Sequence, residues 1–216
     1  MAAEDFPVIL LDGCSLLPFQ RLPLHLYEPR YRKMVEAALA ADRRFAVAES
    51  IMTADGKQGV GPWATLGHVI LHESIDGGRH IVLLEGEVRL KVEGLSKLRP
   101  FPTLRAEIVP DGDAGPDAHI VLARTTATME RLLAKAVIED DAAMLLHRLQ
   151  QLAASHPGRF ADAAAGHLIQ DTNLRRKLLA LTNPVVRLRH VQDALARLEV
   201  ELSLGPQTPG FDPTLN

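Results

Sequence analysis

The chain has 216 residues, 47% of them hydrophobic, with a formal net charge of −3 and one cysteine, Cys14. This length suits one large domain or two small ones and can bury a core. The charge argues against non-specific attachment to nucleic acid, which needs a strongly basic surface. The lone cysteine excludes an internal disulfide and favours a reducing compartment.

The sequence has no stretch of about 18 uncharged apolar residues, so no membrane span is predicted. The N-terminal residues MAAEDFPVILLDG place acids before a short apolar run and contain no basic segment, which is unlike a signal peptide. We therefore expect a cytoplasmic protein.

Residues 1–112 are predicted to form short strands and one early helix. Pro29 suits the first position of a helix over 29–42, where its missing N–H is not needed. The apolar residues of this helix recur at helical spacing and should face the core: Tyr31, Met34 or Val35, Ala38 and Leu39. The expected strands cover 6–11, 44–50, 65–75, 79–87, 87–93 and 103–109. Asp76-Gly77-Gly78 predicts a hairpin, because these residues tolerate positive φ.

Two stretches predict how their strands are covered. In HIVLLE (80–85) apolar residues point both ways, which predicts a strand covered on both sides. In EVRLKVE (87–93) Val88, Leu90 and Val92 alternate with charged residues, so one face should meet water.

Helix formers dominate after the Pro110–Ala118 loop, which is the best candidate linker. We expect a first helix from about Ala118 to Val137, a second that stops at His156, two short helices, and a long final helix. Asn183 should cap that last helix, with Pro184 in its first turn. The predicted organisation is a β-barrel subdomain over 1–112, a helical bundle subdomain over 113–205 and a disordered tail over 206–216.

The sequence lacks the patterns that carry common chemistry. It contains no nucleotide-binding loop, nucleophile elbow, zinc-protease motif or C-x-x-C pair. His68, His72 and His80 are the candidates for a metal or acid–base site, but strand spacing of four separates the first two Cα atoms by roughly 13 Å. Surface or hydrogen-bonded histidines are the commoner arrangement, so we expect no metal site, no cofactor and no catalytic residue.

The order of pieces resembles the N-terminal substrate-binding domain of Lon-type proteases. The stretch LPLHLYEPRYRKMV (22–35) matches the core motif of that family, followed by Gly67–Val69, the hairpin over 76–80 and the G-x-x-R-[FL] strand at 86–90. The helical part over 160–195 is similar to the C-terminal bundle of that family. The chain departs from the family at Leu17–Arg21, where a phenylalanine-proline-glycine step is usual.

The resemblance implies an α+β fold, a PUA-like β-barrel or pseudobarrel with one early helix, followed by an α-helical bundle. Glu28, Pro29, Arg30 and Tyr31 would form the structural corner between strand and helix. The nucleotide-binding loop and the serine–lysine segment of the full protease have no counterpart in this sequence. We therefore expect a stand-alone, non-catalytic domain protein rather than a protease.

The expected function is binding of unfolded or partly unfolded polypeptide, or an adaptor role towards a protease or chaperone. Leu24, Tyr27 and Trp63 are the candidates to line the site; Trp63 belongs to the glycine-rich stretch 53–64 and either contacts ligand or anchors its own segment. RNA binding is the alternative, and a small hydrolase using the three histidines ranks last. The RNA alternative depends on a basic set: Arg175, Arg176, Lys177, Arg187 and Arg189.

Overall fold

The computed structural model describes residues 2–135 and 140–204, and the predicted tail over 206–216 lies outside them. Six strands and an early helix precede five helices, which is the α+β order that the sequence predicts. The strands are β1 (Glu4–Asp12), β2 (Arg21–Leu26), β3 (Arg44–Met52), β4 (Gln58–Ile75), β5 (Arg79–Lys97) and β6 (Thr103–Val109). The helices are α1 (Pro29–Ala40), α2 (Ala118–Lys135), α3 (Asp140–Ser155), α4 (Pro157–Leu168), α5 (Thr172–Ala180) and α6 (Pro184–Leu204).

The strands form a barrel with one strand attached to its side. The order is β2-β5-β4-β3-β1-β6, and a further β5–β6 pairing closes the last five strands into a ring. β1 and β3 run parallel, while the other pairs are antiparallel. β5 can pair with three strands because it is 19 residues long: β2 lies beside its first half and β6 beside its second half.

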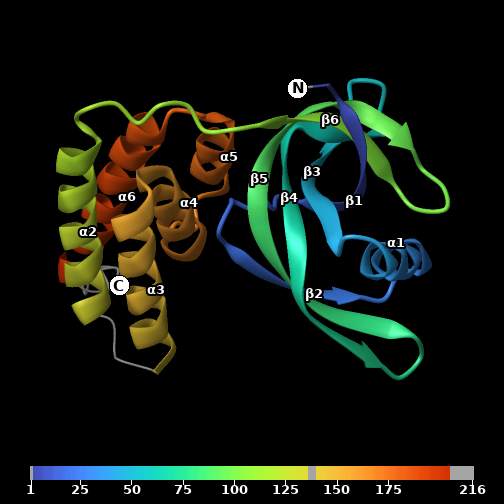
Figure 1. The fold of residues 1–216 in the computed structure, drawn as a ribbon, viewed down its shortest axis with the longest axis horizontal. Coiled ribbons are helices and arrows are strands. Elements are labelled where there is room, and N and C mark those ends of the chain that lie inside the picture. The colour runs from blue at the N-terminus through green and yellow to red at the C-terminus, as the bar shows by residue number, and fades with distance from the viewer. Residues whose placement is uncertain (1, 136–139, 205–216) are drawn as a thin grey trace, which may run out of the picture.

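The hairpin between β4 and β5 turns at the predicted residues, with φ of +79° at Gly77 and +68° at Gly78. α1 lies against the barrel, above this hairpin in the view of Figure 1. Its buried residues are Tyr31, Met34, Val35 and Ala38, which confirms the predicted face. They join a core cluster with apolar residues of five strands, including Ile9, Leu26 and Val82.

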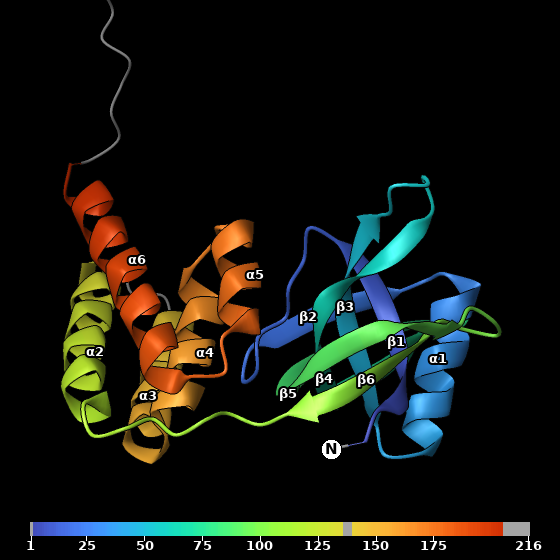
Figure 2. The same cartoon turned by 90° about the horizontal axis from the view of Figure 1, so that it is seen from above.

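The bundle has its own core and stands beside the barrel (Figures 1 and 2). α6 starts as predicted: Asn183 Oδ1 accepts hydrogen bonds from the backbone N–H groups of Val185 and Val186. Leu188, Val191 and Leu195, which form an apolar seam along α6 at spacings of three and four, are fully buried, whereas Leu202, near the end of the helix, is exposed. The seam therefore packs within the bundle.

Both predictions for the faces of β5 need correction. Arg89, expected to meet water, is only 3% exposed, because the bundle packs on that face of the barrel. Conversely, Ile81 is 38% exposed and Leu83 half-buried, although both sides of that stretch were expected to be covered. The alternation of apolar and charged residues along a strand thus predicts which face is polar, but not which face the helical bundle covers.

None of the helices in the described part of the chain is long and apolar enough to cross a membrane.

Candidate functional site

The corner between β2 and α1 contains the residues Glu28–Tyr31. Pro29 occupies the first helical turn, and Glu28 precedes it in extended conformation without capping the helix through its side chain. Glu28 instead accepts a hydrogen bond from Arg30, with Nε and Oε2 2.9 Å apart. The Arg30 guanidinium lies over the Tyr31 ring, 4.6 Å from its centroid, which is a cation–π distance. The charges of this corner are therefore paired locally.

Tyr31 ties the corner to the barrel. Its buried hydroxyl lies 3.3 Å from the backbone nitrogen of Leu10, a potential donor to it, and 3.4 Å from the carbonyl oxygen of the same residue. Burial raises the pKa of the Tyr31 phenol, so the group stays protonated at neutral pH. The pairing of β6 with β1 covers only Glu4–Pro7, so Tyr31 supplies hydrogen-bonding groups to β1 beyond the point where β6 does.

A small pocket opens between β1 and β2 beside Tyr31, and we call it the β1–β2 pocket. Its volume is about 130 Å³, and Leu10, Leu11, Leu24, Leu26 and Tyr27 supply apolar walls. Tyr27 is 63% exposed and Leu24 half-buried. Two of the three candidate binding residues therefore line one pocket.

A second pocket lies on the other side of the corner, and we call it the Arg99 pocket. It measures about 380 Å³ and is lined by Pro29, Arg30, Lys33 and the segment 98–100. Three of its six lining residues are cationic. Arg30 contributes to this pocket and also stacks on Tyr31 of the first pocket, so the two pockets share the corner.

The hairpin arm formed by β2 and the facing ends of β4 and β5 exposes an apolar surface, which we call the outer arm face. Leu83 is paired in register with Pro23 on one side and with Leu71 on the other. Directly paired residues project from the same face of a sheet. Leu71 is 53% exposed, and Ile81 extends the same face by one pair.

Trp63 lies elsewhere. The sequence placed it in a glycine-rich excursion, but it belongs to β4 and pairs with Lys91 of β5. It is half-buried and packs against the core of the helical bundle. Leu24 pairs with Val82 of β5, which in turn pairs with His72 of β4. His72 is nine residues further along β4 than Trp63, which is about 30 Å at strand spacing. The structure therefore does not bring Trp63 together with Leu24 and Tyr27.

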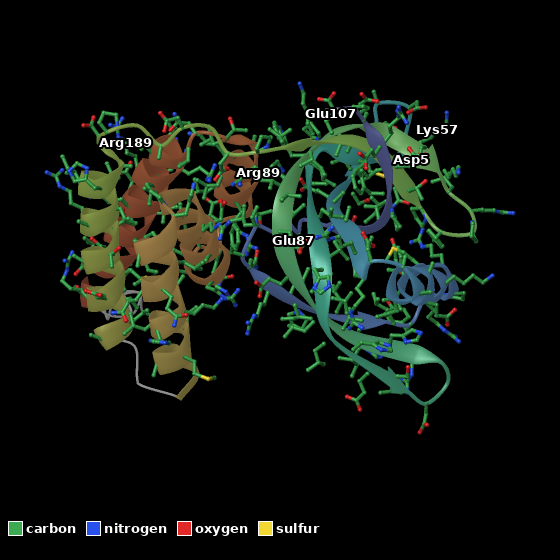
Figure 3. The ribbon with its side chains drawn as sticks, in the orientation of Figure 1. Asp5, Lys57, Glu87, Arg89, Glu107 and Arg189 are labelled. Atoms are coloured by element: carbon green, nitrogen blue, oxygen red, sulfur yellow. The ribbon has the colours of Figure 1, made fainter. Side chains whose placement is uncertain are left out.

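A buried ion cluster joins barrel and bundle, and the sequence analysis missed it. Arg89 of β5 donates two hydrogen bonds to Asp162 of α4, at 2.9 and 2.5 Å. Asp111, in the segment before α2, lies 3.3 Å from Arg89 and 2.5 Å from Arg187 of α6. Arg187 is fully buried, with Nε 3.2 Å from Asp162. Figure 3 shows Arg89 between the barrel and the helices.

The pairing of these charges makes their burial tolerable. Burial raises the pKa of the Asp162 carboxyl, and the guanidinium groups of Arg89 and Arg187 oppose that shift. Arg89 also donates to the backbone carbonyl of Leu179, and Arg187 to that of Leu181. Arg89 is the arginine of the G-x-x-R-[FL] motif, so the family resemblance marked its position without indicating its burial.

The basic set proposed for RNA does not form one free surface. Arg187 belongs to the buried cluster, and Arg176 is paired with Glu49 of the barrel. Arg175 donates to the backbone carbonyl of Ser15 and to the side chain of Gln20. Arg176 is exposed despite its pairing with Glu49, whereas Lys177 and Arg189 are exposed without a recorded ion pair among the described residues, and Figure 3 places Arg189 at the part of the bundle remote from the barrel. The set mainly fastens the bundle to the barrel, which removes the observation that favoured RNA.

Of the three candidate histidines, His72 and His80 lie next to each other across the β4–β5 hairpin. His72 Nε2 lies 3.0 Å from His80 Nδ1 across the hairpin, and His80 Nε2 lies 3.5 Å from Glu36 of α1. Within residues 2–135 and 140–204, no three His, Cys, Asp or Glu side chains gather so that they could hold a metal ion. Burial raises the pKa of the Cys14 thiol, which disfavours the reactive thiolate.

The turn before β2 explains the departure at Leu17–Arg21. The backbone N–H of Gln20 bonds to the carbonyl of Leu17, and Phe19 takes φ of +63° at the third position of this turn. Glycine is the usual residue at such a position, because it adopts positive φ without strain. Phe19 instead packs against the bundle core, with the Arg159 guanidinium 5.2 Å from its ring centroid.

A barrel and a bundle locked by buried charges, with apolar surface left open on the barrel, define a two-part binding module. The model of the family described as the ATP-dependent protease La (LON) substrate-binding domain matches residues 5–197. The chain belongs to this family.

Individual relatives agree with that assignment. The Lon protease of Trichlorobacter lovleyi is 26% identical over 213 residues, which is 94% of this chain and 25% of that protein. The chain thus spans about a quarter of the length of this curated relative. The N-terminal domain of Mycobacterium avium complex Lon protease matches in structure with a TM-score of 0.69 at 19% identity, covering 89% of this chain and 98% of that one. A Lon N-terminal domain protein from Xanthomonas campestris matches with a TM-score of 0.59 at 18% identity, covering 88% and 98%.

Proposed function

We propose that this protein is a non-catalytic module that binds unfolded or partly unfolded polypeptide segments, either as substrate receptor or as adaptor for a protease or chaperone. Membership of a family named for substrate binding supports the general role. The lone thiol of Cys14 supports a reducing, cytoplasmic setting.

The observation that carries the proposal is the outer arm face. Leu71 and Ile81 are exposed there, beside Pro23 and the half-buried Leu83. Adjacent exposed apolar residues on a monomer mark interaction surfaces, because leaving them in water is unfavourable. Unfolded chains expose the same kind of apolar residue that folded proteins bury, so they are suitable partners for such a surface.

A binding titration tests this function. A fluorescently labelled, carboxymethylated unfolded protein is titrated with the wild type and with Leu71→Glu, and anisotropy is recorded. We expect saturable binding by the wild type and at least about tenfold weaker binding by the variant, because a carboxylate is then buried against apolar side chains. Ile120→Glu, at an exposed apolar residue of α2, is the matched control and should bind like the wild type.

The titration can also reject the proposal. Absence of saturable binding by the folded wild type at high micromolar concentration contradicts the function. Equal weakening by the Leu71 and Ile120 variants contradicts the assignment to the outer arm face.

A further inference from the structure

β2 has one side that remains open to pairing. It pairs only with β5 among the described strands, and it stands at the end of the sheet order. In the described part of the chain, no hydrogen bond outside that ladder is recorded for the backbone groups of Leu22–Leu26. In an antiparallel pair, the backbone groups of alternate residues point away from the partner strand, so half of those of β2 face outwards, with Pro23 able to offer only its carbonyl.

The open side borders apolar surface on both faces of the strand. Leu24 and Leu26 line the β1–β2 pocket, while Pro23 lies on the outer arm face. A cavity of about 150 Å³ holds a benzene molecule, so the pocket of about 130 Å³ has room for one apolar side chain. Side chains of an added strand alternate between the two faces. One set would reach the pocket and the other would reach the outer arm face.

The corner that follows β2 carries an excess of positive charge at the Arg99 pocket. Arg30 is balanced by Glu28, whereas Lys33 and Arg99 have no recorded ion pair within the described residues. Both are exposed at the Arg99 pocket, beside the apolar side chain of Leu98. This pocket is therefore complementary to a carboxylate or another anionic group rather than to a cation.

We propose that the polypeptide bound by this module adds a strand to the open side of β2 and places an acidic group at Lys33 and Arg99. The occupant is an extended peptide with an apolar residue for the β1–β2 pocket and a carboxylate beyond it. An open strand edge selects extended polypeptide, because only a backbone with alternating N–H and C=O groups can continue the ladder. This assignment rests on the function proposed above and adds the binding mode and the preferred sequence chemistry.

Paired peptides test both parts of the assignment. The probe is a fluorescein-labelled peptide of about ten residues that alternates valine with threonine and ends in two aspartates. Its partners are the same peptide ending in two lysines and an aspartate peptide whose alternate backbone nitrogens are methylated. We expect the aspartate peptide to bind about tenfold more tightly than either partner, because two ion pairs or several ladder hydrogen bonds are lost.

Charge reversal provides the matched protein variants. Lys33→Glu with Arg99→Glu should remove the preference for the aspartate peptide and shift it towards the lysine peptide. Lys177→Glu with Arg189→Glu makes the same change on exposed residues of the bundle and should leave the preference as in the wild type. Circular dichroism of both double variants checks that they are folded.

The outcomes separate this inference from the function on which it rests. If the unfolded protein binds but aspartate, lysine and methylated peptides bind equally, the function stands and the strand-addition assignment is overturned. If neither the unfolded protein nor any peptide binds, both fall. If a uridine oligonucleotide binds as tightly as the aspartate peptide and the Lys33/Arg99 reversal abolishes its binding, the site selects polyanions and the peptide assignment is overturned.

Discussion

Removing the carboxylate of the buried ion cluster should uncouple the bundle from the barrel. Asp162→Ala deletes the acceptor of both Arg89 hydrogen bonds and the partner of Arg187 Nε, leaving two buried guanidinium groups to share Asp111. Breaking a buried ion pair from one side costs about 3–5 kcal/mol. Because Asp111 still contacts both arginines, we expect about 3 kcal/mol, a large part of the 5–15 kcal/mol typical of folded proteins.

The chain provides its own probe for this change. Trp63 is the only tryptophan and packs against the bundle core, so its fluorescence reports on the interface. Urea unfolding is followed by Trp63 fluorescence and by far-UV circular dichroism. For the wild type the two transitions should have the same urea midpoint. For Asp162→Ala the fluorescence transition should have its midpoint at a lower urea concentration than the circular dichroism transition.

Two further variants separate charge from position. Asp193→Ala removes an exposed carboxylate from α6 and should change stability by less than about 0.5 kcal/mol. Replacing Arg89, Asp162 and Arg187 together by leucine or methionine should cost less than Asp162→Ala, because no guanidinium group stays buried without its partner and Asp111, the carboxylate left behind, is only half-buried. A loss of under about 1 kcal/mol for Asp162→Ala, or a triple variant less stable than the single one, refutes the electrostatic account.

Three more predictions concern the interface. Burial, together with neighbouring arginines, lowers the pKa of His167, so the folded state favours the neutral ring. The free energy of unfolding should therefore fall as the pH drops below about 6.5. In urea titrations between pH 7.5 and 5.5, the His167→Gln variant should lose less stability than the wild type. Gly86→Ala should cost about 2–3 kcal/mol in the same assay, since a Cβ there would lie 2.4 Å from the Leu17 carbonyl oxygen, whereas Gly112→Ala should be nearly neutral. Phe19→Ala should be less stable than Phe19→Gly by about 1 kcal/mol, reversing the usual order, because φ at this position is +63°.

Most of the barrel and bundle could be predicted because local patterns determine them. The hairpin needs positive φ at Gly77 and Gly78, and Asn183-Pro184 satisfies the first turn of α6. The covering of β5 could not be predicted, because Arg89 looks like any outward charged residue until Asp162, 73 residues later, is placed beside it. The proposed division at residue 112, between β6 and α2, stays a prediction.

The candidate site was predictable in part for the same reason. Leu24 and Tyr27 are close in sequence to the corner that positions them, and both line the β1–β2 pocket. Trp63 was grouped with them because tryptophan suits ligand contacts, but pairing with Lys91 carries it to the opposite part of β4. Lys33 and Arg99 were missed because 66 residues separate them, and only the folded chain brings them to one pocket.

The corner residues show how a scaffold motif can also shape the proposed binding site. Tyr31 uses its hydroxyl to satisfy the backbone of Leu10, and in doing so it holds α1 across the gap between β1 and β2. A sixth barrel strand in that gap would have paired the open side of β2. Because Tyr31 provides hydrogen-bonding groups at β1 without supplying a strand, β2 keeps unpaired backbone beside an apolar pocket. The residue that completes the fold is thus also the one that leaves the edge of β2, the proposed binding edge, open.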